Sequence, residues 1–304
     1  MKDEKKKRAQ KRALGKGNYH FCTDGLSGGK MFNNVVEYAF GLIQLGLICI
    51  RFSLVIYAFS LMPNHIHIIL NGTGEDCLMA FDFLKRRLTA RLKKDGFAPL
   101  PEDYWFKLVP IESPEQMKHE IIYVLRNALE AGLGMAEGYI WSSGWLYYSD
   151  FPELLHRQPA MSLSIKIRNH ITGGEDEIPQ DWCFHPYLGI IPDAFVDTSL
   201  VLRLFPSPKD LQTALVKDFE VSYQIAGRLG ELVKFNKAET DSIVAQTLDR
   251  RFGGQPLRTL REEDRGKLAI ILHREFGFDS YQISTSIYLK EIVVRQLLSS
   301  KELR

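Results

Sequence analysis

Apolar and polar positions in the first half of the chain alternate between strand-like and helix-like spacing. Helical spacing of apolar residues is found over 32–47, 76–94 and about 113–129, and strand patterns over 18–24, 52–59 and 64–71. Met62 and Pro63 form a short break between the last two strands, which is typical of a β-hairpin. The order strand, helix, strand, strand, helix, helix predicts an α+β fold with a mainly antiparallel sheet.

The third helix has a strong start signal. Ser113 is placed to cap it, Pro114 fits its first position, and Gln116 completes a capping box. The helix is expected to run to about Leu129 and to end at Gly132. Its beginning is therefore the best defined element boundary in the chain.

The second half of the chain is mostly helical in pattern. Residues 151–186 have no firm periodicity, although Met161, Leu163, Ile165 and Ile167 alternate as in a strand. Helical spacing follows over 209–219, 237–251 and 261–276, and a final pair of helices ends the chain. We therefore expect a basic arm at 1–16, an α+β domain at 17–150, a connecting region at 151–200 and a mainly α-helical domain at 201–304.

The apolar run over residues 39–62 is long enough to suggest a membrane span, but its middle is polar. Arg51 lies near the centre and Gln44 also interrupts the run, and an uncompensated arginine at bilayer depth costs about 2.5–3.5 kcal/mol. A buried helix followed by a strand is the better interpretation. Residues 1–16 are a run of lysines and arginines without an apolar stretch behind it, which does not fit a signal peptide. We expect a cytoplasmic protein with no membrane contact.

Composition and charge restrict the remaining possibilities. Of the 304 residues, 45% are hydrophobic, which is ample for a sizeable core. The net charge of +2 lacks the global excess of a histone-like protein, so any nucleic-acid affinity must come from local patches. The four cysteines are too far apart in sequence for a C-x-x-C site, and they fit reduced thiols.

Two histidines are the first candidates for chemistry. His65 and His67 are two residues apart on a predicted strand, so both side chains project from one face while Ile66 and Ile68 enter the core on the other. Such a pair on a rigid strand suits a divalent metal. The alternative is two histidines on a solvated sheet face.

The capped helix carries a second polar stripe. His119, Tyr123 and Asn127 are spaced at i, i+4 and i+8, so they line one face of the helix, with Arg126 beside it. A tyrosine on a helix usually packs in a core. Because both of its neighbours on the stripe are polar, we expect the phenol of Tyr123 to be exposed to a site instead.

Together these residues resemble the REP-associated tyrosine transposases, a group of single-tyrosine HUH endonucleases. The matching segments are Tyr-His at 19–20, Tyr-Ala-Phe-Ser-Leu-Met-Pro-Asn-His-Ile-His at 57–67, Tyr-Val-Leu-Arg-Asn-Ala-Leu-Glu-Ala-Gly-Leu at 123–133 and Tyr-Ile-Trp-Ser-Ser at 139–143. All four motifs occur in the right order over residues 18–148. One departure is Ala128, where the family usually has proline, and this change leaves the helix continuous without removing a functional group.

The resemblance implies a fold and a set of roles. The fold is a ferredoxin-like antiparallel sheet with helices on one face, followed here by the mainly α-helical C-terminal region. Tyr123 would be the nucleophile, and His65, His67 and Asn127 the metal ligands. The implied activity is that of a DNA transposase which cuts and rejoins single-stranded DNA near a hairpin through a 5′-phosphotyrosine intermediate. His20 is expected to matter less.

The identity of the metal depends on which argument is followed. Imidazole ligands alone favour zinc or a late transition metal. The family resemblance implies magnesium or manganese, which we expect here because a metal that polarises phosphate must exchange oxygen ligands readily.

Basic residues near the site are candidates for DNA contacts. The helix over 83–94 is rich in lysine and arginine with only Asp82 nearby, a composition also typical of a solvated amphipathic face. Next to an HUH site, phosphate contact is favoured. The expected DNA-binding residues in this half of the chain are Lys85, Arg86, Arg87, Arg91, Lys93, Lys94 and Arg126.

The C-terminal residues 261–300 resemble a helix-turn-helix. A helix over 261–276 is followed by a turn at Gly277, a second helix starting near Ser280 and a recognition helix after Leu289. Tyr288 occupies the turn position where glycine is usual, so a plain helical packing domain stays an alternative. Lys290 and Arg295 would face the DNA groove.

Two other functions compete with a transposase. One is a domesticated DNA-binding or regulatory protein that keeps the fold and does not cut, and the presence of all four chemical residues argues against it. The other is a plasmid replication initiator or relaxase of the HUH superfamily, whose resemblance to this chain is confined to the histidine motif. The expected partner is DNA, and the protein is expected to be a monomer or a homodimer.

Overall fold

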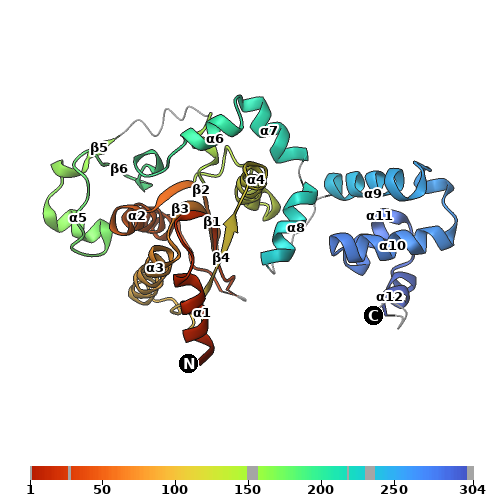
Figure 1. The fold of residues 1–304 in the computed structure, drawn as a ribbon, viewed down its shortest axis with the longest axis horizontal. Helices are drawn as coiled ribbons and strands as arrows, with labels where there is room; N and C mark the ends of the chain where they lie inside the picture. Colours follow the sequence, from red (N-terminus) through yellow and green to blue (C-terminus); the bar gives the residue numbers. More distant parts are fainter. Residues whose placement is uncertain (1, 27–28, 149–156, 218, 230–236, 300–304) are drawn as a thin grey trace. The chain divides into compact units, whose positions relative to one another are not determined.

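The protein forms two compact units, Met1–Lys217 and Asp218–Arg304 (Figure 1). The structure is a computed structural model, and it describes residues 2–26, 29–148, 157–217, 219–229 and 237–299. The first unit contains an antiparallel sheet covered by helices, and the second is helical. The α+β class with a helical C-terminal region is as expected from the sequence.

A four-stranded antiparallel sheet is the centre of the first unit. Its strands are β1 (Gly17–Thr23), β2 (Val55–Leu61), β3 (Ile66–Gly72) and β4 (Phe106–Ile111), in the order β2-β3-β1-β4. Three of them match the strand patterns in the sequence. The edge strand β4 was not predicted, because it is short and contains Pro110, which breaks a strand pattern but is tolerated at a sheet edge.

Helices cover both faces of this sheet. The long helices α2 (Val35–Phe52) and α3 (Gly74–Lys94) pack on the face that carries Phe21 and Ile68. Helix α4 (Pro114–Glu130) packs on the opposite face, against Ala58 and Ile69. In this respect the structure differs from the expected placement of helices on one face. Alternation of side chains along each strand produces the two separate apolar surfaces.

The apolar run that resembled a membrane span folds as α2 and β2. Helix α2 is long and apolar enough to cross a membrane, with a mean hydropathy of 1.6, but 61% of its residues are buried inside the fold. Leu42, Leu45 and Ile48 are fully buried in the core beside the sheet. The interpretation as a buried helix followed by a strand is therefore confirmed.

All four cysteines are free thiols. Cys22 and Cys77 are buried in the first unit, and burial raises the pKa of the Cys77 thiol to about 12. This agrees with the reduced state inferred from their spacing.

Most of the predicted basic arm at 1–16 is a helix that packs on the first unit. Helix α1 (Lys2–Arg12) packs against α3. Arg8 forms a bidentate pair with Asp82 at 2.7 and 3.0 Å, and the Lys11 ammonium lies 4.6 Å from the centre of the Phe106 ring. Burial lowers the pKa of Lys11. The charged side chains of Arg8 and Lys11 therefore hold this helix against the rest of the first unit.

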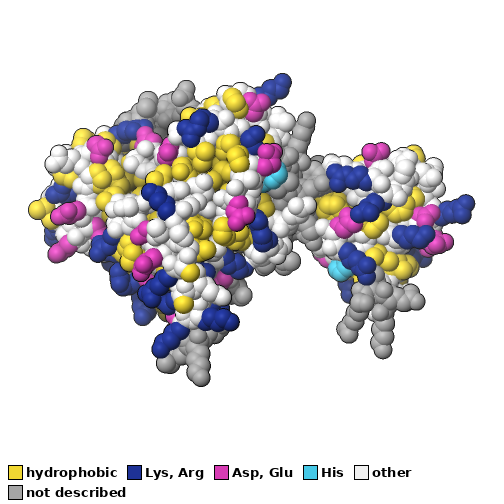
Figure 2. Space-filling view, viewed as in Figure 1, with side chains coloured by type: hydrophobic (Ala, Val, Ile, Leu, Met, Phe, Trp, Pro, Cys, Tyr) yellow, Lys and Arg dark blue, Asp and Glu magenta, His cyan; other side chains and the backbone are white. Residues whose placement is uncertain are grey.

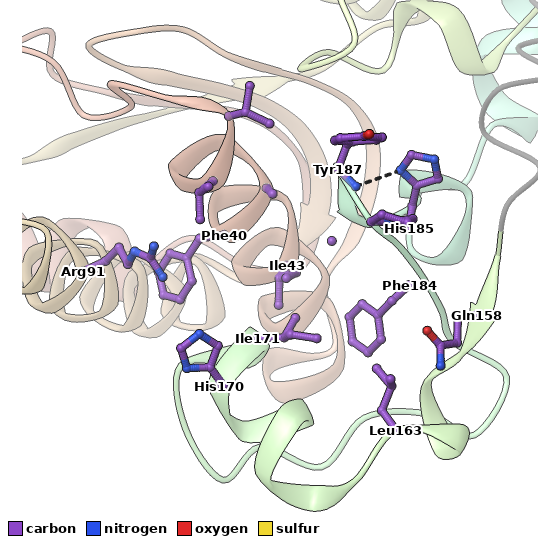
Figure 3. A pocket seen from close by; sticks show the side chains of 15 residues that line it. Phe40, Ile43, Arg91, Gln158, Leu163, His170, Ile171, Phe184, His185 and Tyr187 are labelled. Atoms are coloured by element: carbon purple, nitrogen blue, oxygen red, sulfur yellow. Dashed lines mark hydrogen bonds between the residues drawn. The ribbon is translucent and has the colours of Figure 1, made fainter.

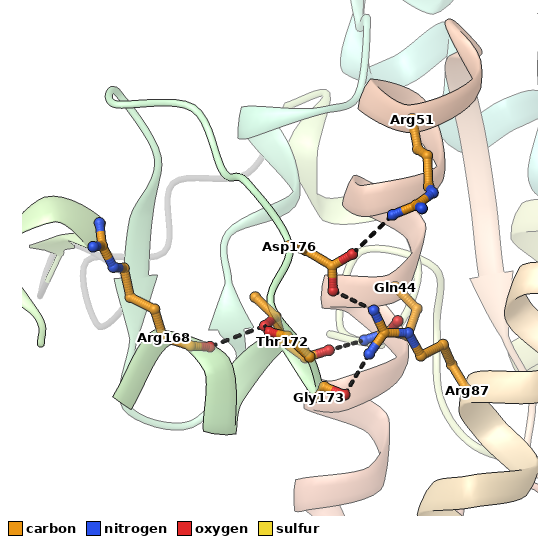
Figure 4. A network of polar contacts seen from close by, with 8 residues as sticks. Gln44, Arg51, Arg87, Arg168, Thr172, Gly173 and Asp176 are labelled. Atoms are coloured by element: carbon orange, nitrogen blue, oxygen red, sulfur yellow. Dashed lines mark hydrogen bonds and ion pairs between the residues drawn. The ribbon is translucent and has the colours of Figure 1, made fainter. Parts of the chain in front are cut away.

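The connecting region contains a short helix, α5 (Ile165–Thr172), where alternation of apolar residues had resembled a strand. Figure 4 shows how this region is attached to α2 and α3. Gln44 donates to the Thr172 carbonyl at 2.9 Å, and the Asp176 carboxylate pairs with both Arg51 and Arg87. These contacts span more than 80 residues of sequence, so local periodicity did not reveal them.

Short elements complete the first unit. A second, small antiparallel sheet consists of β5 (Gln158–Pro159), β6 (Cys183–His185) and β7 (Gly189–Ile190). Single turns of 3-10 helix lie at Gly144–Leu146, Ala160–Ser162, Pro192–Ala194 and Leu257–Thr259, the last in the second unit.

Two further helices belong to the first unit, although the sequence placed them with the C-terminal domain. Helices α6 (Ser199–Leu204) and α7 (Pro208–Lys217) contribute to the apolar cluster beneath α4. Their buried residues in this cluster are Val201, Phe205, Leu211 and Leu215. The α+β domain therefore extends beyond the predicted limit at residue 150, which itself lies outside the described residues.

The second unit is helical, with helices α8 (Phe219–Leu229), α9 (Lys237–Phe252), α10 (Glu262–Phe276), α11 (Ser280–Ile287) and α12 (Glu291–Ser299). Helices α9 to α12 share one apolar core centred on Leu268, Leu272 and Ile287. Helix α10 ends at Gly277 in the left-handed conformation, and Asp279 and Gln282 form a capping box for α11. The predicted order helix, turn, helix, turn, helix is confirmed.

Candidate active site

The four residues singled out by the sequence come together on the face of the sheet that α4 covers. The ring centroids of His65 and His67 are 4.7 Å apart, and the Tyr123 ring lies 5.4 Å from His67. The Asn127 side-chain amide donates to the Tyr123 carbonyl at 2.9 Å, and Asn127 acts to raise the pKa of the neighbouring His67. Ile66 and Ile68 are buried on the other face, as the period of the strand predicts.

Two more buried side chains extend this cluster. His20 of β1 lies beside His67, with 3.0 Å between His20 Nε2 and His67 Nδ1. On its other side, His20 Nδ1 lies 2.7 Å from Glu120 Oε2 of α4, and both side chains are fully buried. A continuous chain of hydrogen bonds therefore links Glu120, His20 and His67.

The sequence interpretation undervalued His20 and missed Glu120. Glu120 is three residues before Tyr123, so it occupies the same side of α4. His20 belongs to the Tyr-His motif of the first strand, but its role depends on the pairing of β1 with β3. That pairing places Cys22 opposite His67 and brings His20 onto the same face.

The orientation of the two imidazoles fits a metal site. His65 Nδ1 lies 2.8 Å from Asn64 Oδ1, and His67 Nδ1 is engaged by His20. The Nε2 atoms are thus the ones presented for coordination, as in most histidine sites with an outer hydrogen-bond partner. Among the described residues, no group of three or more His, Cys, Asp and Glu side chains is arranged to hold a metal. The role of Asn127 as a third ligand stays a prediction from the family resemblance.

Burial defines the electrostatics of the cluster. Burial, together with the neighbouring His65 and His20, holds the pKa of His67 well below its usual range. His67 is therefore neutral at pH 7, which is the form that binds a metal. His65 is only partly buried, so the cluster approaches the surface on its side.

Tyr123 is more enclosed than its polar stripe suggested. Its side chain is 2% exposed, because the rings of His20 and His67 pack against it within 5.8 Å. The expectation that the phenol faces an open site is wrong for this structure.

The basic residues of α3 lie on the helix that covers the opposite face of the sheet. Three of the six are engaged within the protein: Lys85 with the carbonyls of residues 102 and 104, Arg87 with Asp176, and Arg91 with Asp95. Arg86, Lys93 and Lys94 are exposed. Their predicted contact with DNA stays a prediction, but it cannot be made at the histidine face.

Arg126 does not suit the DNA contact predicted for it. Its side chain is completely buried, with Nε 3.2 Å from Glu130 Oε1 and a hydrogen bond to the Leu215 carbonyl. Arg126 therefore joins α4 to α7 and supports the helix that carries Tyr123.

A separate surface pocket of about 420 Å³ lies on the outer side of α2 (Figure 3). Phe40 and Ile43 of α2 face Phe184, His185 and Tyr187 across it. Helix α2 and the sheet separate this pocket from the histidine cluster. Acidic and basic side chains are intermingled over the face of the molecule shown in Figure 2.

The protein-family models and the curated proteins contain no match to this chain. Among solved structures, the chain is similar to the structure of a REP-associated tyrosine transposase bound to a REP hairpin. The two share 16% sequence identity with a TM-score of 0.37, over 45% of this chain and 82% of that chain.

Proposed function

We propose that this protein cuts and rejoins single-stranded DNA near a hairpin, with Tyr123 as the nucleophile. The proposal rests on the proximity of four side chains. Tyr123 and Asn127 of α4 lie beside His67 of β3 and His65 just before it, and the Tyr123 and His67 ring centroids are 5.4 Å apart. A tyrosine beside a pair of histidines that could hold a divalent metal is an arrangement suited to phosphoryl transfer to a phenol.

The chemistry explains each member of the site. A phenol with a pKa near 10 is about one part in a thousand ionised at pH 7, so attack on phosphorus needs assistance. Bound magnesium or manganese would polarise a non-bridging phosphate oxygen. His65 Nε2, His67 Nε2 and the Asn127 amide oxygen would hold that ion.

The bonds exchanged are balanced and reversible. Tyr123 Oη forms a bond to phosphorus and loses its proton, while the 3′ oxygen leaves and takes up a proton. The products are a 5′-phosphotyrosine and a free 3′-hydroxyl. Because the covalent link preserves the energy of the phosphodiester, a 3′-hydroxyl can attack it and rejoin the strand without ATP.

Glu120 and His20 act as positioning residues in this proposal. Glu120 accepts from His20 Nδ1–H, so His20 Nε2 is an acceptor for His67 Nδ1–H. With this tautomer the lone pair of His67 is on Nε2, where it would be available to a divalent ion. The chain of hydrogen bonds thus fixes both the ring angle and the proton of one ligand.

The direct test is formation of a covalent adduct. Labelled hairpin oligonucleotides with single-stranded flanks are incubated with the full chain and manganese, and adducts are detected on denaturing gels. We expect an adduct with the natural chain and none with Tyr123→Phe. Tyr187→Phe, which alters an exposed tyrosine outside the site, is the matched control and should behave as the natural chain.

The competing function is DNA binding without cutting. It predicts hairpin binding but no adduct with any oligonucleotide of the panel, whether or not Tyr123 is present. Adducts that persist in Tyr123→Phe would instead show that another residue is the nucleophile.

A further inference from the structure

The second unit contains a helix pair with the features of a double-stranded DNA reader. Helix α11 and helix α12 are joined by a short turn at residues 288–290, and α10 packs against both. The side chains that hold the three helices together are Ile283, Ile287, Leu289 and Val294, all buried. In a helix-turn-helix the second helix of the pair enters the major groove, and here that helix is α12.

The turn has the backbone conformation that this motif needs. Tyr288 adopts φ 57° and ψ 40°, in the left-handed region where glycine is usual. Only Ser53 and Tyr288 among the described non-glycine residues have positive φ. An exposed tyrosine held in a conformation that costs roughly 1–2 kcal/mol indicates a constraint beyond packing.

The outer face of α12 has a composition suited to base edges. Ile292, Arg295, Gln296 and Ser299 are spaced at i, i+3, i+4 and i+7 and are all exposed. Arginine pairs with guanine, glutamine with adenine, and an aliphatic side chain packs on the thymine methyl group. Ile292 is 65% exposed and is therefore accessible to such a contact.

Charge around α12 is compatible with DNA. Lys290 is exposed just before the helix. The nearby carboxylate of Glu291 is engaged by Arg295 at 2.7 Å and by the Ser280 hydroxyl at 3.2 Å. Acidic and basic residues nearly balance over residues 257–299, so non-specific attraction to phosphates is small.

We propose that α12 is a recognition helix that reads a short sequence in double-stranded DNA, with Ile292, Arg295 and Gln296 contacting bases and Lys290 a phosphate. This activity is separate from the proposed cutting of a single strand at Tyr123. It gives the chain a second DNA site with a different substrate, a duplex in place of a single strand.

The test selects the preferred duplex. The full chain carrying Tyr123→Phe, which cannot form the proposed adduct, is used to enrich labelled duplexes with a random centre by repeated gel-shift selection. We expect one short motif to be enriched. Gln296→Ala and Ile292→Ala should each relax the motif at one position, and Arg295→Ala combined with Gln296→Ala should lower affinity about 10-fold or more.

A matched control uses an arginine outside α12. Arg251 on α9 is exposed and paired with Glu275 at 3.1 Å, much as Arg295 is paired with Glu291. Arg251→Ala should select the same motif with unchanged affinity. Because all the altered side chains are exposed, circular dichroism melting curves should coincide with that of the parent chain.

Two results would overturn the proposal. One is a full chain that enriches no duplex motif, and the other is an α12 double variant that selects the same motif with the same affinity. Failure here is distinguishable from failure of the cutting proposal, because Arg295→Ala with Gln296→Ala on a natural Tyr123 background should still form hairpin adducts within a few-fold of the natural chain.

Discussion

His67 is the residue on which the geometry of the candidate site depends most. Its ring contacts His65, Tyr123 and His20, and its Nδ1 atom is the end of the hydrogen-bond chain from Glu120. Complete burial keeps it neutral, with a pKa well below the usual range. A metal ligand needs both properties, a fixed angle and a free-base imidazole.

Removal of a metal ligand should abolish cutting. We expect His65→Ala or His67→Ala to weaken manganese binding by at least about 10-fold and to eliminate adducts, because one of three protein ligands is lost. Titration calorimetry with manganese measures the affinity. His170→Ala, which alters the outer pocket, is the control. Unchanged affinity in both site variants would mean that the pair is only a polar patch on the sheet.

The positioning residues should matter almost as much. Glu120→Gln keeps the size of the side chain but weakens its hold on the proton of His20, and His20→Ala removes the partner of His67. We expect metal affinity and adduct yield to fall about 10–100-fold in each. Glu115→Gln, on an exposed position of the same helix, should have no effect. Normal manganese affinity in Glu120→Gln would contradict the tautomer assigned to His67.

The sequence predicted His65, His67, Tyr123 and Asn127 because each pair is separated by the period of one strand or one helix. It did not predict the role of Glu120 with His20, since that contact joins residues 100 apart and depends on how β1 lies beneath α4. The burial of Tyr123 was missed for the same reason. Local spacing says which side chains share a face, whereas tertiary packing decides what covers them.

At the scale of elements, the turn between α11 and α12 stores backbone strain. Tyr288 is in the left-handed region and 67% exposed, so replacing it removes little packing. We expect Tyr288→Gly to raise the free energy of unfolding of the second unit by about 0.5–1 kcal/mol, because glycine adopts this conformation without the steric cost. Urea unfolding followed by circular dichroism measures the change.

A second glycine variant, at a position with ordinary helical backbone, should have the opposite effect on the free energy of unfolding. Tyr281→Gly, in the first turn of α11, should lower the free energy of unfolding by up to about 1 kcal/mol, since glycine disfavours a helix. If both substitutions destabilise the unit equally, the Tyr288 side chain contributes packing that outweighs the strain.

Elements with strong local signals were predicted well, and those fixed by distant contacts were not. The capped start of α4 is a local signal, and Ser113 Oγ accepts from the backbone N–H of Gln116 at 3.1 Å as expected. The second half of the predicted capping box is not formed, because the Gln116 side chain accepts from the Glu112 N–H instead of the Ser113 N–H. Helix α1 is held by the Arg8–Asp82 pair and α5 by the contacts of Asp176, and neither partner is close in sequence. Strand β4 forms because its backbone pairs with β1 at the edge of the sheet, where Pro110 of β4 is tolerated.

For the whole molecule, the folded α+β unit includes α6 and α7. Val201, Phe205, Leu211 and Leu215 pack beneath α4, and burial of each contributes roughly 1.5–3 kcal/mol. Their sum is comparable to the total stability of a typical domain, about 5–15 kcal/mol. The spacing of apolar residues predicted a helical second half, but it did not show which of those helices pack in the first unit.

A pair of truncations tests this arrangement. A chain ending at Lys217 should fold and form hairpin adducts, whereas a chain ending at Tyr148 should lose the cooperative thermal transition and the adducts. Loss of α6 and α7 exposes the apolar side of α4 that they cover. It also removes the Leu215 carbonyl, which accepts a hydrogen bond from Arg126. Circular dichroism melting and the adduct gel measure the two properties. A shorter chain that folds and cuts as well as the longer one would contradict this domain limit.

The most direct measurement of the central claim is the site of covalent attachment. The manganese-dependent adduct with a hairpin oligonucleotide is digested with protease and nuclease, and the modified peptide is sequenced by mass spectrometry. Our account predicts a nucleotide 5′-phosphate on Tyr123, in the tryptic peptide that ends at Arg126. Attachment to any other residue, or the absence of an adduct over the whole hairpin panel, would contradict it.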